Sequence, residues 1–336
     1  MTASALPAPF DRAAPVWAAP MAGGPTTPEL VIAAARAGYV AQLAAGYQTA
    51  EAMVDDVRRV REAGVDLFGV NLFVPNTHTI SPVAHAAYAR SLGIDDPADP
   101  REDDDDWPAK IARLVADPVP LVSFTFGLPD AADIAALRGA GTTTAQTVTG
   151  LDEARAAEAA GVDLVVVQGV AAGGHSGIWS ADALPAERPL PELVAEIAAA
   201  VTLPIVAAGG IVSPSDVADV LAAGARAASV GTALLRATES GASPTHRAAL
   251  ADPRFDDTTL TRAFTGRYAR ALVNAFVDAH DAEAPSGYPA IHFLTKPLRA
   301  EASAAGDAEH LHLWAGRGWR ACREAPAAEI LASLVP

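Results

Sequence analysis

The sequence predicts an α/β protein built on a (β/α)8 TIM barrel, with an additional, mostly helical lid subdomain. Two observations lead to this fold class. The chain has 336 residues, more than the roughly 250 of a bare barrel. Eight short apolar runs alternate with alanine-rich helical stretches between Val16 and Leu235. A parallel strand that is covered on both faces has apolar residues throughout, so it appears in the sequence as a continuous apolar run. Such runs alternating with helical stretches favour a buried parallel sheet surrounded by helices.

The elements follow one another in a repeated unit of helix and strand. Five predicted helices end on an Ala-Gly pair, because glycine suits the position after a helix C-terminus: Ala37-Gly38, Ala63-Gly64, Ala140-Gly141, Ala160-Gly161 and Ala223-Gly224. The strands predicted after these pairs are Tyr39–Ala44, Asp66–Phe73, Thr142–Val148, Asp163–Gln168 and Ala227–Leu235. Three further apolar runs complete the eight strands: Val16–Met21, Leu121–Phe126 and Pro204–Ala208.

An open doubly wound sheet is the alternative fold. Its first strand-to-helix turn would carry the G-x-G-x-x-G pattern of a dinucleotide site. The corresponding turn here reads Ala22-Gly23-Gly24-Pro25, so the barrel is preferred.

Two segments interrupt the alternation. The stretch from Ser91 to Pro118 contains the acidic run from Arg101 to Asp106, which we expect to be a solvated surface loop. After Leu235 the chain becomes helical and irregular. We therefore expect a barrel over residues 1–236, a lid or substrate subdomain over 237–312, and a C-terminal segment over 313–336 that returns to the barrel.

Composition and charge restrict the partners. The chain is 51% hydrophobic and 19% charged, which suits a large folded core, and its formal net charge is −16. Such a charge repels nucleic acid and anionic membranes, so we expect a small-molecule ligand and neither of those partners. We expect a cytoplasmic protein, because there is no long apolar span or signal pattern and Cys322 is the single cysteine.

A glycine-rich loop after the sixth strand carries the main catalytic candidate. The run Val165-Val166-Val167-Gln168 leads into Gly173-Gly174-His175-Ser176-Gly177. Glycine lets a flat ligand approach the backbone closely, and a neutral imidazole accepts protons near physiological pH. His175 is therefore the predicted base. The alternative is a tight turn that carries an exposed histidine.

The ends of the other strands supply candidate cofactor residues. In a barrel, phosphate groups commonly bind the loops after strands seven and eight, which here contain Gly209-Gly210 and Gly231-Thr232. Their backbone N–H groups, with a helix starting near Ser213-Pro214, predict an anion site. Pro20, Met21 and Ala22 offer apolar surface to a ring system, and the amides of Asn71 and Gln168 can bond its heteroatoms.

These motifs resemble the nitronate monooxygenase family, formerly called 2-nitropropane dioxygenases, which are FMN-dependent barrel enzymes related to flavin-containing enoyl-ACP reductases. The resemblance extends to Ala19-Pro20-Met21-Ala22-Gly23-Gly24, Val70-Asn71-Leu72-Phe73 and Ala208-Gly209-Gly210-Ile211. The later motifs look like those of class I members: Thr261-Arg262-Ala263-Phe264-Thr265-Gly266-Arg267, Ala269-Arg270 and Leu313-Trp314-Ala315-Gly316. One departure is Ala171, where many relatives have glutamate.

The resemblance implies oxidation of alkyl nitronates, and possible use of neutral nitroalkanes, by O2 to a carbonyl compound and nitrite. It implies His175 as the base or polarising group, no metal, and a monomer or homodimer. Together with the strand-end reasoning it gives the candidate FMN residues Pro20, Met21, Ala22, Asn71, Gln168, Gly173, Gly174, Gly209, Gly210, Gly231 and Thr232.

Two alternative functions stay open from the sequence. One is an NADH-dependent flavin reductase of enoyl thioesters or quinones, because those relatives share the glycine loop and its histidine. The other is a flavin-holding protein without turnover. A Schiff-base enzyme is disfavoured because neither Lys110 nor Lys296 lies at a strand end, and thiol chemistry because Cys322 is near the C-terminus.

Overall fold

The barrel predicted from the sequence is present in the structure, a computed structural model that describes residues 4–75 and 79–336. Eight parallel strands form one sheet in the order β1 (Val16–Ala18), β9 (Ala227–Val230), β8 (Ile205–Ala208), β6 (Leu164–Gln168), β5 (Thr143–Val148), β4 (Leu121–Thr125), β3 (Gly69–Phe73) and β2 (Gln42–Ala44). A parallel bridge between Ala18 and Ala41 brings the two ends of this order together. The sheet is thus a nearly closed barrel, and the doubly wound alternative is wrong.

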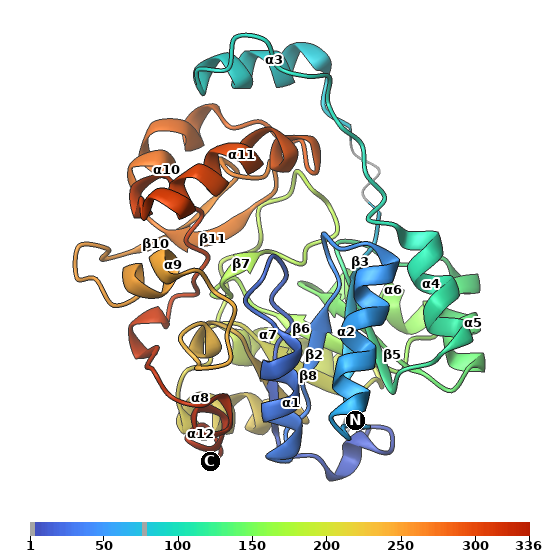
Figure 1. Cartoon of the computed structure of the whole chain (residues 1–336). Coiled ribbons are helices and arrows are strands. Elements are labelled where there is room, and N and C mark those ends of the chain that lie inside the picture. The colour runs from blue at the N-terminus through green and yellow to red at the C-terminus, as the bar shows by residue number, and fades with distance from the viewer. Residues whose placement is uncertain (1–3, 76–78) are drawn as a thin grey trace.

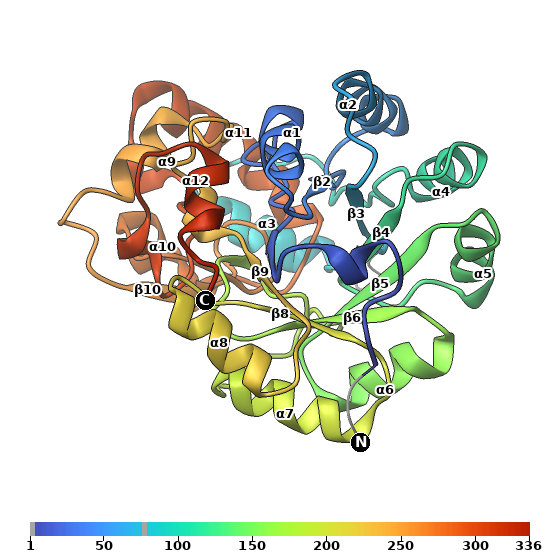
Figure 2. The same ribbon diagram turned by 90° about the horizontal axis from the view of Figure 1, so that it is seen from below.

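Helices surround the strands, as Figure 2 shows from below. The helices before β9 are α1 (Pro28–Arg36), α2 (Ala50–Glu62), α3 (Pro82–Ser91), α4 (Trp107–Ala116), α5 (Ala131–Gly139), α6 (Leu151–Ala160), α7 (Leu190–Ala200) and α8 (Pro214–Ala222). The glycines of all five predicted Ala-Gly ends have φ between 76° and 116°, the left-handed conformation expected there. No helix among the described residues is long and apolar enough to cross a bilayer.

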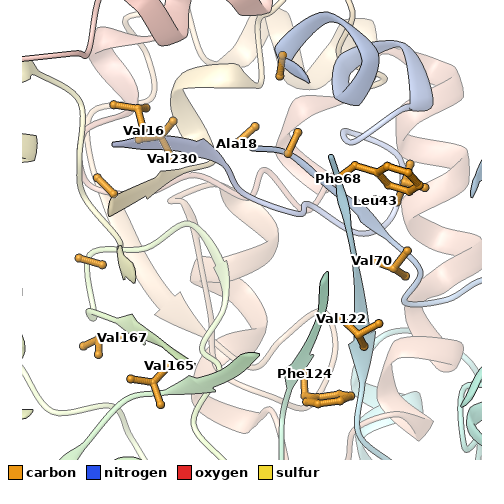
Figure 3. Close-up of a cluster of buried hydrophobic side chains, with 14 of the residues drawn as sticks. Val16, Ala18, Leu43, Phe68, Val70, Val122, Phe124, Val165, Val167 and Val230 are labelled. Carbon is orange, nitrogen blue, oxygen red and sulfur yellow. The ribbon is translucent and has the colours of Figure 1, made fainter. Parts of the chain in front are cut away.

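Alternate residues of each strand face the helices. Val122 and Phe124 of β4, and Val165 and Val167 of β6, are buried in a cluster that also contains helix residues such as Leu114. Figure 3 shows members of this cluster on their strands. Burial of apolar surface stabilises the fold by about 25 cal/mol per Å². This layer between strands and helices is therefore the main hydrophobic core.

The inward residues change character along the barrel axis. Near the N-terminal ends they are apolar: Trp17, Leu121 and Leu164 cluster with Phe10 of the 3₁₀ helix η1 (Phe10–Arg12). Two to four residues further along the same or neighbouring strands, the inward positions are largely polar: Asn71, Ser123, Thr125, Thr147, Gln168 and Ser229. One end of the barrel is therefore closed by a hydrophobic plug, while the other presents polar groups.

Residues 237–312 contain α9 (Pro244–Ala249), β10 (Thr258–Thr261), β11 (Ala269–Leu272), α10 (Ala275–His280) and α11 (Ala290–Ala305). The antiparallel pair β10 and β11 was not predicted. β11 also pairs with β7 (Gly174–His175), so the loop of the predicted base is the third strand of this small sheet. Figure 1 shows α10, α11 and α3 at the end of the molecule away from both termini. The C-terminal α12 (Ala327–Ala332) packs near α1.

The acidic run before α4 is only partly the solvated loop that we expected. The Asp105 carboxylate accepts hydrogen bonds from Tyr47 N (2.7 Å) and from Lys110 Nζ (2.8 Å). The Asp106 carboxylate accepts one from Ala50 N at the start of α2 (2.7 Å). These two residues turn inward because they satisfy a buried ammonium group and a helix N-terminus, while the rest of the run is more exposed.

Candidate active site

A cavity of about 590 Å³ lies at the carboxyl ends of the barrel strands. All twelve residues that the sequence singled out line it: His175, Pro20, Met21, Ala22, Asn71, Gln168, Gly173, Gly174, Gly209, Gly210, Gly231 and Thr232. They come from strands far apart in the sequence. The barrel brings them together because the carboxyl ends of parallel strands meet at one rim.

Polar side chains inside the barrel hold one another in place. Asn71 donates through Nδ2 to Ser123 Oγ (2.8 Å) and to Thr125 Oγ1 (3.1 Å), and Ser123 donates to Gln42 Oε1 (2.6 Å). The amide nitrogen of Asn71 is therefore used by the barrel itself. Its carbonyl oxygen is the group that this network leaves for a ligand.

Gln168 holds the glycine loop. Its Oε1 accepts a hydrogen bond from Gly177 N (2.6 Å), and its Nε2 donates to the carbonyl of His175 (3.4 Å). The oxygen and the nitrogen of the Gln168 amide therefore both form hydrogen bonds with the segment that carries the predicted base. One N–H of the amide is left for a bond to a bound ring.

The two glycine turns shape the cavity floor. Gly209 and Gly210 have φ of 110° and 78°, and a Cβ on Gly210 would lie 2.8 Å from the Ala171 Cβ. Gly231 has φ of −112°, and the three atoms nearest to a Cβ there would belong to Met21 and Ala19, the closest at 3.5 Å. The first turn thus requires glycine because its backbone has positive φ. At Gly231 the backbone suits any residue, and the absence of a side chain mainly leaves space in the cavity.

The helix N-terminus expected to assist anion binding is already occupied. Helix α8 begins after Ser213, as predicted, but the Asp216 carboxylate accepts hydrogen bonds from Val212 N and Ser213 N, both at 2.9 Å. This capping box uses N–H groups at the start of α8 and places a negative charge beside them, which opposes anion binding there. The α8 terminus is therefore a weaker anion site than the sequence predicted, and the glycine N–H groups remain as anion donors.

His175 lies in the cavity wall among aromatic rings. Its ring centre is 5.3 Å from that of Trp314, 5.6 Å from Phe126 and 5.9 Å from Tyr288. Burial, and to a lesser degree the positive charges of Arg267 and Arg299, lowers the pKa of His175 to about 3. The imidazole is neutral at physiological pH. A bare turn with an exposed histidine does not describe this environment.

Thr265 sets the hydrogen bonding of His175. The two side chains meet at 2.9 Å between Nε2 and Oγ1, and the Thr265 hydroxyl also donates to the carbonyl of Arg267 (3.2 Å). Because a hydroxyl has one proton, Nε2 of His175 is then the donor to Thr265. The lone pair of the neutral ring is on Nδ1.

One wall of the cavity was not predicted from the sequence. Helix α11 contributes His292, Lys296 and Arg299, and the loop after β2 contributes Tyr47. The three α11 positions are spaced by four and three residues, a signal of one helix face that could have been recognised. Tyr47 and Phe126 have positive φ (66° and 79°), which is rare for aromatic residues and costs free energy.

The described lining of the cavity is free of negatively charged side chains. None of the described residues that line it is Asp or Glu, whereas Lys296 and Arg299 are both present. This contrasts with the net charge of −16 for the chain. The interior of the site therefore favours anionic ligands.

Comparison with known proteins decides the family. Residues 9–336 match the family model described as nitronate monooxygenase. The chain belongs to the nitronate monooxygenase family. It is a flavin-dependent oxidoreductase, and the resemblance seen in its motifs is confirmed.

Similar proteins carry related names. A probable nitronate monooxygenase of Staphylococcus aureus is 33% identical, over 96% of this chain and 93% of its own length. The solved structure of a nitroalkane oxidase from Streptomyces ansochromogenes is 48% identical with a TM-score of 0.91, covering 96% of this chain and 94% of that one. FabK from Thermotoga maritima, at 24% identity and a TM-score of 0.71, covers 97% and 93% and shares the fold.

Proposed function

We propose that this member of the family oxidises alkyl nitronates with O2, using FMN, and releases a carbonyl compound and nitrite. The observation that carries the proposal is the cavity without carboxylates. A nitronate is an anion, as is the phosphate of FMN, and the described lining residues offer both ligands donors and positive charge.

The residues present suit FMN. The backbone N–H groups of Gly210, Gly231 and Thr232 would hold its phosphate, and the missing side chain at Gly231 leaves the room that a Cβ would fill. Met21 and Ala22 would contact the ring system, while Asn71 and Gln168 would bond its polar edge. FMN, when bound, supplies the electron transfer from the nitronate and the reaction with O2.

The protein would contribute binding, orientation and proton handling. His175 has a neutral ring with its lone pair on Nδ1, so it would remove the α-proton of a neutral nitroalkane. A pre-formed nitronate needs no such step. For that substrate His175 would polarise the nitro group, and the surrounding rings of Phe126, Tyr288 and Trp314 would exclude water.

We propose the same division of the chain that the sequence predicts: an FMN-binding barrel over 1–236, a substrate subdomain over 237–312 and a returning segment over 313–336. Supporting it, α11 lines the cavity and β11 pairs with β7. The return is supported by a bridge between Ala237 and Ala325.

Activity with propionate 3-nitronate tests the function. The purified yellow protein should consume O2 and release nitrite, and the nitronate should bleach the flavin anaerobically. NADH should bleach it slowly. Bleaching by NADH at rates that match nitronate turnover would instead support the reductase, and no reaction with either reductant would support a flavin-holding protein.

A further inference from the structure

One face of α11 lines the cavity with side chains that can donate hydrogen bonds. His292, Lys296 and Arg299 line it, together with Ala300 and Ser303. The His292 side chain is buried, and its ring stacks on that of Tyr47 with 4.3 Å between centres and 4° between planes. This stacking fixes the plane of the imidazole, so that the ring can form hydrogen bonds only through the nitrogens at its edge.

Arg299 fixes the tautomer of His292. Its Nη2 lies 3.3 Å from His292 Nδ1 and 2.8 Å from the His292 carbonyl, while its Nε donates to Thr295 Oγ1 (3.1 Å). A guanidinium group only donates hydrogen bonds. Nδ1 of His292 must therefore be an acceptor, and the proton of the neutral ring is on Nε2.

The Nε2–H group lies on the edge of the ring that Arg299 does not use. The hydrogen bonds described for His292 involve its Nδ1 and its main-chain carbonyl. The ring stays neutral, because burial and then the positive charges of Arg299, Lys296 and Arg101 lower its pKa to about 2. The site thus has a donor on its wall whose state does not change across the physiological pH range.

The position of His292 favours the substrate over the cofactor as its partner. Tyr288 lies between the two histidines, with its ring centre 5.9 Å from that of His175 and 6.4 Å from that of His292. His292 is thus grouped with the predicted base, and it belongs to α11 and not to the glycine turns after β8 and β9.

We propose that His292 binds the substrate as a neutral hydrogen-bond donor through Nε2–H, with an anionic oxygen of the nitronate as acceptor and Arg299 as the positioning residue. This inference rests on the proposed function. It adds a binding residue from outside the barrel and explains why a buried arginine lies against a histidine.

Steady-state kinetics of two variants of the holoenzyme test the proposal. His292→Phe keeps a ring on Tyr47 but has no donor, whereas His292→Gln offers an amide N–H near the place of Nε2. We expect KM for propionate 3-nitronate to rise about 10–100-fold in His292→Phe, the usual loss for a hydrogen bond to a charged group, and to recover largely in His292→Gln. The rise should be constant between pH 5.5 and 8.5, with FMN affinity unchanged. His310→Gln, at an exposed histidine paired with Asp307, is the control.

The opposite results are equally specific. A KM within twofold of wild type in His292→Phe would overturn the proposal, and so would weaker FMN binding with unchanged KM. A rise that disappears at high pH would show a protonated ring instead of a neutral donor.

A second measurement does not depend on turnover. In holoenzyme carrying ¹⁵N-labelled histidine, the His292 signals, assigned by their loss in His292→Gln, should show a protonated Nε2 and a bare Nδ1. Arg299→Met should shift this tautomer. A protonated Nδ1 in the wild type would overturn the proposal whatever the activity, while a wild type without nitronate turnover would refute the proposed function alone.

Discussion

At the scale of single residues, the histidines of the site are neutral, and its positive charge is on other side chains. His175 and His292 are both neutral and both have one nitrogen committed to a neighbour, Thr265 or Arg299. Positive charge comes from Arg299 and Lys296 instead. In the proposed reaction, neutral His175 would accept a proton from carbon, and the nearby fixed cations would stabilise the resulting anion.

His175→Asn tests the base. The variant should retain FMN, because the proposed flavin contacts come from other residues: backbone N–H groups, Met21, Ala22, Asn71 and Gln168. Activity on a neutral nitroalkane should fall by about 10²–10⁴, the usual contribution of a positioned base. Activity on the pre-formed nitronate should fall less, since only hydrogen bonding worth about 1–3 kcal/mol is lost. Turnover of both substrates under air gives the two losses. Equal losses would mean that His175 polarises the nitro group without acting as the base.

At the scale of elements, the proposed phosphate site involves two glycine turns, one after β8 and one after β9. The capping box of α8 opposes anion binding at the helix terminus, so the proposed phosphate site depends on Gly209-Gly210 and Gly231-Thr232. Substitution of Gly210 would strain a left-handed backbone as well as fill space. Gly231 is the cleaner position because its φ of −112° suits any residue.

Gly231→Leu should therefore fold but lose FMN. Its Cβ has room in the protein, and the rest of the side chain would occupy the cavity beside Met21. The measurement is the ratio of flavin to protein absorbance after gentle purification, with circular dichroism to verify folding. Gly139→Leu, at an exposed glycine of α5 with open space around it, is the matched control. Full flavin occupancy in Gly231→Leu would mean that the phosphate lies elsewhere.

The elements also show what could be predicted from the sequence. All eight barrel strands were found because burial on both faces leaves apolar runs in the sequence, as in Leu164–Gln168. Their ends were less accurate. The strand predicted to Leu235 ends at Val230, and Thr232–Leu234 forms a 3₁₀ helix, since an apolar run alone does not distinguish a strand from a helical turn.

The unpredicted parts depend on contacts between distant segments. β7 has two residues and no pattern of its own, and it becomes a strand only by pairing with Ala269 and Arg270. The predicted site residues lie at strand ends, where the barrel alone brings them together. His292 and Arg299 reach the cavity from a helix whose docking no local pattern specifies.

At the scale of the whole molecule, ionisable groups are sorted by sign and by burial. The chain has 40 acidic and 24 basic residues, yet the described lining of the cavity has no carboxylate. Several histidines are buried as neutral rings around it. Burial, and for His292 also nearby positive charge, lowers the pKa of His246 to about 4 and that of His292 to about 2. The stability of the fold should then depend on pH through these histidines.

The sign of this dependence follows from the proton count. Above a pH of about 6.5 both folded and unfolded states keep these rings neutral, and they contribute no pH dependence. As the pH falls below that value, the unfolded chain takes up protons that the folded one excludes, so the free energy of unfolding decreases. For His246 the loss continues down to a pH of about 4. At pH 5 it amounts to about 2 kcal/mol, because each pKa unit corresponds to about 1.4 kcal/mol.

His246→Gln should remove this part of the acid sensitivity. The ring donates through Nε2 to the carbonyl of Trp314 (3.0 Å), and a glutamine amide can make the same bond without taking up a proton. Between pH 7 and pH 5, urea unfolding of the holoenzyme should therefore show a decrease smaller by about 2 kcal/mol in the variant than in the wild type. His310→Gln, at an exposed histidine, should leave the wild-type decrease unchanged. If His246→Gln lost as much stability on acidification as the wild type, the neutral state of His246 would not be a source of the pH dependence, and the acid sensitivity would have to come from other groups.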